Sequence, residues 1–243
     1  MTRRFEVLPD VNAVAVASAD RLIAAGRNAI RRRGRFMLAL SGGSTPLAVC
    51  PYLVVPPRVK MLDWTKVQFF FGDERAVPPD DAASNYDIAR RALLDYLPRV
   101  SMDQVHRMHA ESSDLDRAAV DYEAEMRRVF GVDDPAGWPR FDLIWLGMGA
   151  DGHTASLFPG SEGLGERKRW VIANWAPGRS VWRLTLTLPV LNAAREAMFV
   201  ATGAEKAEAV AAIRFGTADL PAARVHARRT TWLVDRAAAG ARR

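Results

Sequence analysis

The stretch FDLIWLGMGADGHTASLFPG, residues 141–160, decides the fold of this chain. Its first six residues form a nearly unbroken apolar run that ends in glycines, a pattern typical of a buried strand in a parallel sheet. The ligand crevice of an open α/β sheet lies beyond the carboxyl ends of its strands, so this turn is predicted to face a ligand. Asp151 and His153 lie there, in a backbone that can approach a ligand closely. The alternative is an ordinary Asp-Gly turn in which Asp151 caps a helix and His153 is solvated.

Length and composition indicate a globular protein with a full hydrophobic core. The 243 residues are 49% hydrophobic and 26% charged. No apolar run reaches the roughly 20 residues of a membrane helix, and the N-terminus leads into no signal-type apolar segment. The one cysteine, Cys50, cannot form an internal disulfide, and together with the four histidines it lacks the spacing of zinc ligands. We therefore expect a cytoplasmic protein without a metal or a membrane partner.

The net charge of +6 has two interpretations, a nucleic-acid-binding surface or an enzyme that attracts small anions. The basic residues are scattered along the chain, and the longest run is the three arginines at 31–33. Nearly all of them are arginine, which resembles a compositional bias more than a designed basic patch. The scatter favours the enzyme, so we expect no nucleic-acid partner.

A second buried strand is expected at 36–40, and it leads directly into Ser-Gly-Gly-Ser-Thr-Pro at 41–46. Free backbone N–H groups at a helix start, close-approach glycines and hydroxyl donors together make a cradle for an anion. The predicted cradle residues are Gly42, Gly43, Ser44 and Thr45. The alternative is simple N-capping of the helix by one of the hydroxyls. Pro51 is expected to interrupt this helix within about two turns.

A third buried strand, at 67–71, ends in the polar turn Gly-Asp-Glu-Arg at 72–75. Its charged residues follow a core strand, so they are expected at the same crevice edge as the other two turns. Asp73 and Arg75 are therefore candidate site residues, although an ordinary solvated turn is the alternative.

Strands and helices alternate along most of the chain. Further strands are expected at 6–8, 105–108, 170–173, 181–188, 198–203 and 231–234, and helices at 12–33, 85–97 and 115–130. This order predicts an α/β fold with a mainly parallel, Rossmann-like sheet flanked by helices. There is no internal repeat or linker, so residues 1–243 are expected to form a single domain. Residues 147–152 match GxGxxG, but no apolar helix follows them, which argues against dinucleotide binding.

In combination, these segments resemble the 6-phosphogluconolactonase family. The matching segments are SGGSTP at 41–46, GDERAVP at 72–78, SNY at 84–86, LGMGADGHTASLFP at 146–159, RLTLT at 183–187, TGAEK at 202–206 and PAA at 221–223. The resemblance implies the fold shared with glucosamine-6-phosphate deaminase. It also implies hydrolysis of 6-phospho-D-glucono-1,5-lactone to 6-phosphogluconate without a metal or an organic cofactor. The deaminase is the alternative, because it too uses an Asp-Gly-His loop and an Asp-Glu turn.

Lactone hydrolysis needs an activated water, a stabilised oxyanion and a protonated leaving group. His153 is the expected general base, and either Asp151 or Asp73 is expected to orient it. Arg75 is expected to bind the carbonyl oxygen or the substrate's hydroxyls. The phosphate is expected to be held by Gly42, Gly43, Ser44, Thr45, Lys206 and Arg183. The expected partner is a sugar-phosphate lactone, and both a monomer and a dimer remain open.

Overall fold

The central element of the molecule is a six-stranded sheet with the strand order β1-β9-β8-β5-β2-β3. The computed structural model describes residues 2–177 and 181–240, apart from the side chains of residues 44–46. The strands of this sheet are β1 (Thr2–Leu8), β2 (Phe36–Leu40), β3 (Val67–Phe71), β5 (Leu143–Leu146), β8 (Glu196–Ala201) and β9 (Arg229–Asp235). All neighbouring strands pair in parallel, which confirms the α/β fold with a mainly parallel sheet.

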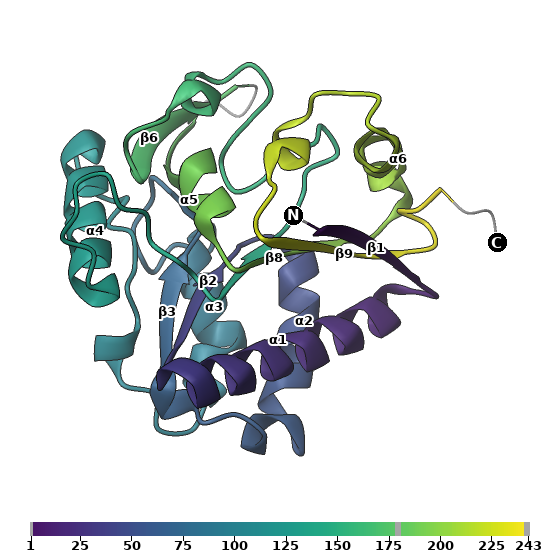
Figure 1. Ribbon diagram of the computed structural model, residues 1–243, viewed down its shortest axis with the longest axis horizontal. Coiled ribbons are helices and arrows are strands. Elements are labelled where there is room, and N and C mark those ends of the chain that lie inside the picture. The colour runs from purple at the N-terminus through teal and green to yellow at the C-terminus, as the bar shows by residue number, and fades with distance from the viewer. Residues whose placement is uncertain (1, 178–180, 241–243) are drawn as a thin grey trace.

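Helices cover both faces of this sheet (Figure 1), with α1 and α2 on one side and α5 and α6 on the other. The helices are α1 (Val11–Arg33), α2 (Ser44–Val54), α3 (Asn85–Ala92), α4 (Leu115–Phe130), α5 (Leu188–Ala193) and α6 (Ala207–Phe215). The alternation of side chains along β2 explains the two layers. Met37 and Ala39 join the core formed with α4, α5 and α6, whereas Leu38 and Leu40 join the core formed with α1, α2 and α3.

Local sequence signals account for the ends of the long helices. The Asp10 side chain accepts a hydrogen bond from Ala13 N–H at 2.8 Å at the start of α1, and Gly34 ends this helix at φ +74°. Asp114 and Gly131 serve the same purposes for α4. The predicted bounds of α4 are confirmed.

No helix in residues 2–177 or 181–240 is both long enough and apolar enough to cross a membrane.

Two helix predictions were wrong. α2 does not stop at Pro51 but continues through it to Val54. Val49 and Leu53 are buried on either side of the proline, so apolar packing outweighs the loss of one backbone hydrogen bond. α3 ends at Ala92 rather than at residue 97, and a separate 3₁₀ turn, Leu94–Tyr96, follows it.

The sequence also missed a second, three-stranded sheet, which is antiparallel and has the order β4-β7-β6. Its strands are β4 (Asp73–Arg75), β6 (Val171–Ala176) and β7 (Val181–Leu186). The predicted polar turn after β3 is therefore a strand. Because β4 pairs with β7, Arg75 is placed opposite Arg183 in the register. This pairing brings side chains from two distant parts of the chain to the edge of the parallel sheet.

Candidate active site

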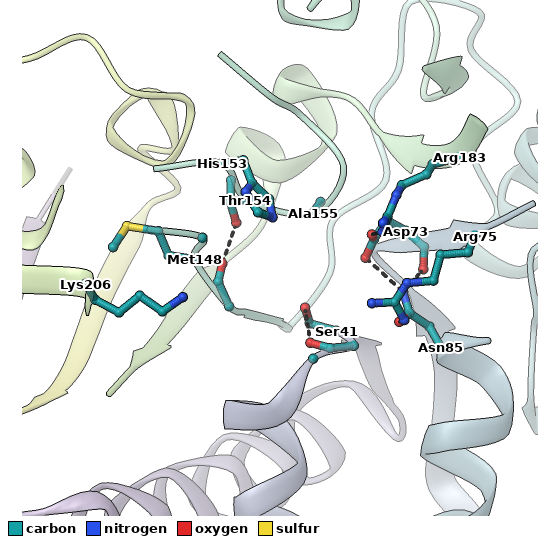
Figure 2. A pocket seen from close by; sticks show the side chains of 14 residues that line it. Ser41, Asp73, Arg75, Asn85, Met148, His153, Thr154, Ala155, Arg183 and Lys206 are labelled. Carbon is teal, nitrogen blue, oxygen red and sulfur yellow. Dashed lines mark hydrogen bonds and ion pairs between the residues drawn. The ribbon is translucent and has the colours of Figure 1, made fainter. Parts of the chain in front are cut away.

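A pocket of about 170 Å³ lies at the carboxyl ends of the parallel strands. Its wall includes Ser41 and Gly147, the residues that directly follow β2 and β5. Figure 2 shows the side chains that converge on it. The pocket is lined by Ser41, Gly42, Gly43, Asp73, Arg75, Asn85, Gly147, Met148, Gly149, His153, Thr154, Ala155, Arg183 and Lys206. The three turns that the sequence singled out therefore meet at one place, as the rule for open α/β sheets predicts.

His153 lies against Asp151 in the turn after β5. The imidazole Nδ1 is 2.5 Å from Asp151 Oδ1, and the backbone N–H of His153 donates to the same oxygen at 3.1 Å. Burial raises the pKa of Asp151, but the hydrogen bonds and the charge of His153 outweigh it and leave that pKa below its ordinary value. An ionised Asp151 places the proton on Nδ1, which leaves Nε2 as the nitrogen that accepts a proton.

Packing also holds this imidazole in place. The ring of His153 lies on that of Phe158, with their centroids 4.6 Å apart, and its side chain is only 16% exposed. There is no helix between Gly147 and Ser161. Asp151 therefore caps no helix and His153 is not a solvated turn residue, so the alternative interpretation of this turn was wrong.

Asp73 occupies a different place, where it joins three elements. Its Oδ2 accepts a hydrogen bond from Ser156 Oγ at 2.6 Å and lies 3.8 Å from Arg183 Nη1. Its Oδ1 accepts from Asn85 Nδ2 at 3.2 Å. The carboxylate is thus held by the turn that carries His153, by β7 and by α3.

Glu74, in β4, has a structural role, because its side chain binds the first turn of α3. Its carboxylate accepts hydrogen bonds from the backbone N–H groups of Asn85 at 2.6 Å and Tyr86 at 2.8 Å, and from Ser84 Oγ at 3.0 Å. Burial raises the pKa of this carboxyl group, and the hydrogen bonds only partly offset that effect. Asp73 and Glu74 are 5% and 3% exposed, so the interpretation of this segment as a solvated turn was wrong.

Arg75 lines the pocket, and its guanidinium is held by residues at the start of α3 and just before it. Its Nη1 donates to the carbonyl oxygen of Ala83 at 2.8 Å and to Asn85 Oδ1. Sequence reasoning did not select Asn85 as a site residue. Asn85 stands in the family-matching segment SNY at 84–86, but its place directly after the helix-capping Ser84 does not distinguish it from any residue in a first helical turn.

Three further predicted residues, Gly42, Gly43 and Lys206, also line the pocket. Gly43 adopts φ +94° and ψ 172°, a conformation that favours glycine, immediately before α2. Lys206 extends toward the pocket from a 3₁₀ turn, Ala204–Lys206 (Figure 2). The side chains of Ser44 and Thr45 lie outside the described part of the structure. Within that part, no group of three or more His, Cys, Asp or Glu side chains is arranged to hold a metal ion.

Comparison with known proteins adds the family. The model of the family described as glucosamine-6-phosphate isomerases/6-phosphogluconolactonase matches residues 9–233. The chain belongs to this family.

Individual members of the family are similar over nearly their whole length. The 6-phosphogluconolactonase of Mycobacterium tuberculosis is 40% identical over 248 residues, which cover 98% of each chain. That of Nostoc sp. is 37% identical over 245 residues, covering 99% of this chain and 98% of the relative. The solved 6-phosphogluconolactonase from Trypanosoma cruzi superimposes with a TM-score of 0.85 at 29% identity, covering 98% of this chain and 96% of that one.

Proposed function

We propose that this protein hydrolyses 6-phospho-D-glucono-1,5-lactone to 6-phospho-D-gluconate, the lactonase step of the pentose phosphate pathway. The names of its relatives supply the substrate. The observation that carries the mechanism is the 2.5 Å contact of His153 Nδ1 with Asp151, at the wall of a pocket that also contains Arg75, Arg183 and Lys206. A base and several cations in one pocket suit an anionic ester substrate.

His153 acts as the general base. Its Nε2 accepts a proton from a water as the water oxygen attacks the lactone carbonyl carbon. The tetrahedral oxyanion then collapses, the bond from that carbon to the ring oxygen breaks, and the ring oxygen takes the proton back from His153. The new carboxylic acid ionises and releases one proton. Asp151 is the orienting carboxylate, because it holds Nδ1 while Asp73 accepts from Ser156 and Asn85.

The arginines stabilise charge on the substrate. Arg75 and Arg183 come from paired strands on one wall of the pocket, and we assign to them the developing oxyanion and the neighbouring hydroxyls. Lys206, Gly42 and Gly43 also line the pocket, and we assign to them the phosphate, together with the start of α2, an 11-residue helix. Ser44 and Thr45 complete this proposed phosphate site.

The competing activity in this family is that of the glucosamine-6-phosphate isomerases. Moving a proton between adjacent sugar carbons requires a carboxylate that is available as a base. Asp73, the carboxylate in the pocket wall, accepts hydrogen bonds from Ser156 and Asn85 and lies 3.8 Å from the Arg183 guanidinium. Both oxygens of this carboxylate are already engaged by groups of the protein, and this arrangement favours the lactonase.

The test compares the two activities in one preparation. We expect rapid proton release from 6-phosphogluconolactone in the presence of EDTA, and no ammonia from glucosamine 6-phosphate. Ammonia release at a comparable rate contradicts the proposal and leaves the fold unaffected.

The absence of a metal and an organic cofactor, the cytoplasmic location and the lack of a nucleic-acid partner remain predictions. Failure to retain duplex DNA at physiological salt is the expected result for the last of these.

A further inference from the structure

Asn85 is buried in the pocket wall with both ends of its amide occupied. It is 2% exposed at the first position of α3. Its Nδ2 donates to the carbonyl oxygen of Asp73 at 2.8 Å and to Asp73 Oδ1 at 3.2 Å, while its Oδ1 accepts from Arg75 Nη1. These partners fix the orientation of the amide, because only the nitrogen donates and only the oxygen accepts. Neither an acid nor an apolar side chain of similar size can make the same set of bonds.

The backbone of Asn85 is fixed as well. Its N–H donates to Glu74 Oε1 at 2.6 Å, and Glu74 lies between Asp73 and Arg75 in β4. The backbone bond thus keeps the first residue of α3 next to β4, which places the side chain within reach of Asp73 and Arg75.

The same amide occupies the space next to Gly42. A Cβ atom added to Gly42 would lie 1.7 Å from Asn85 Oδ1, 2.4 Å from its Cγ and 2.9 Å from its Nδ2. The three closest atoms all belong to this one amide. Gly42 is thus a residue at which a side chain would collide with Asn85.

Gly43, the next residue, requires glycine for a different reason. It adopts φ +94°, and a Cβ atom there would meet nothing within 4 Å. Its conformation requires glycine, whereas the surroundings do not. The backbone of Gly42 lies outside the left-handed region, so its requirement for glycine is one of space. The two neighbouring positions therefore require glycine for different reasons, which are space at Gly42 and backbone conformation at Gly43.

We propose that Asn85 is a positioning residue that holds the Arg75 guanidinium at the pocket, and that Gly42 is glycine to make room for it. This inference rests on the proposed function, in which Arg75 contacts the substrate. It connects the Ser41–Gly43 loop, on the phosphate side, to the arginine on the side of the reacting carbon. Figure 2 shows Ser41 of this loop beside the Asn85–Arg75 pair.

The test is a double-mutant cycle of Gly42→Ala and Asn85→Ala, read as kcat/KM for the phosphorylated lactone. Gly42→Ala alone is expected to lower kcat/KM by roughly 10–10²-fold, because residues in contact couple strongly. In the Asn85→Ala background the same change is expected to cost less than about 2-fold, since the colliding amide is gone. Gly43→Ala is the matched control, and its cost should be the same in both backgrounds. An equal cost of Gly42→Ala in both backgrounds would overturn the steric part of the proposal.

Asn85→Asp tests the positioning part. It keeps the shape of the side chain but removes the donor and places a second carboxylate beside Asp73. We expect kcat to fall at least as far as in Asn85→Ala, with a smaller change in the affinity for 6-phosphogluconate measured by calorimetry. A variant with wild-type kcat would show that Asn85 only fills space.

The cycle also separates this inference from the proposed function. If the wild-type protein hydrolyses no lactone, the proposed function fails, and the steric coupling can then be read from the free energy of unfolding in denaturant. Loss of the Gly42→Ala penalty in the Asn85→Ala background is expected there too. If the Gly42→Ala penalty persists in that background, the steric inference is wrong whether or not the protein is active.

Discussion

Ser156 Oγ lies 2.6 Å from Asp73 Oδ2, so a hydroxyl three residues after His153 is bonded to a carboxylate of the antiparallel sheet. Both side chains are buried. The turn is held from a second direction by Asn174 Nδ2, which donates to the carbonyl oxygen of Ser156 at 2.7 Å. These two bonds fix the distance between the imidazole and the strand that carries Arg75.

Ser156→Ala is expected to remove the bond to Asp73 and destabilise the fold by about 1.5–3 kcal/mol, the range for a hydrogen bond to a charged group. Because the His153 turn loses its anchor, kcat should fall by roughly 10-fold or more. Denaturant unfolding and steady-state kinetics measure the two effects. The exposed Ser113→Ala is the control, and a Ser156 variant indistinguishable from it would show that the anchor is unimportant.

His153→Ala is expected to lower kcat by roughly 10²–10⁴-fold while the affinity for 6-phosphogluconate changes little, because the lost group acts on the water. Calorimetric titration with the product checks the second half of this prediction. A fully active variant would remove the proposed mechanism without removing the substrate assignment.

Asp151→Asn is expected to change the pH profile as well as the rate. The bond between Asp151 and His153 lowers the pKa of the carboxyl group, and the same interaction stabilises the protonated imidazole. Without it, the acid limb of kcat/KM should move to lower pH while the plateau falls by roughly 10–10³-fold. An acid limb that moves to higher pH would contradict this assignment of the pair.

Lys206→Ala is expected to weaken the reaction of the phosphorylated lactone far more than that of glucono-1,5-lactone, since only the former has a phosphate for this side chain to bind. Loss of one charge-assisted contact should cost about 1.5–3 kcal/mol in kcat/KM. The ratio of kcat/KM for the two lactones is the measurement. Lys66→Ala, far from the pocket, serves as the control, and equal losses with both lactones would assign Lys206 a structural role.

Glu166→Gln is expected to destabilise the protein in a pH-dependent way. Glu166 accepts from the N–H groups of Arg167, Lys168 and Arg169 and from Arg169 Nε, and these bonds overcome burial and lower its pKa from 4.5 to about 2. The ionised carboxylate therefore stabilises the folded protein fully at pH values above the pKa that Glu166 has in the unfolded chain. This stabilisation is lost as the pH falls toward 2.

The variant should lose about 1–3 kcal/mol at neutral pH and nothing near pH 2. Denaturant unfolding across this range, with the exposed Glu162→Gln as the control, measures the difference. A loss that stays constant with pH would show that the carboxylate's charge is not the cause.

The sequence predicted what local patterns encode and missed what distant pairing decides. Strands such as Phe36–Leu40 and Val67–Phe71 are apolar runs buried on both faces, so composition alone indicates them. β4 consists of three charged residues, and nothing local marks it as a strand, because its partner β7 lies more than a hundred residues later. Pro51 was misjudged because helix propensity was weighed without the packing of Val49 and Leu53.

The residues of the site fall into the same two groups, those that local motifs mark and those that only the folded chain brings together. His153, Asp151 and the glycines stand in motifs whose chemistry can be recognised one turn at a time. The bond of Ser156 to Asp73 and the contact of Asn85 with Gly42 depend on which turns meet, and no spacing along the chain reveals that. Local reasoning can therefore nominate residues that react, whereas residues that hold them are found only in three dimensions.

The pairing of β1 with β9 has a consequence for biosynthesis. Thr2–Leu8 aligns residue by residue with Arg229–Asp235, so the first strand of this sheet to be synthesised has the last one as its partner. During translation β1 therefore has no neighbour in this sheet until β9 has been synthesised. An unpaired strand exposes backbone groups that can pair with other chains. The nascent protein thus carries an unpaired strand from the synthesis of β1 until that of β9, and β1 can join the sheet only after the five other strands have been made.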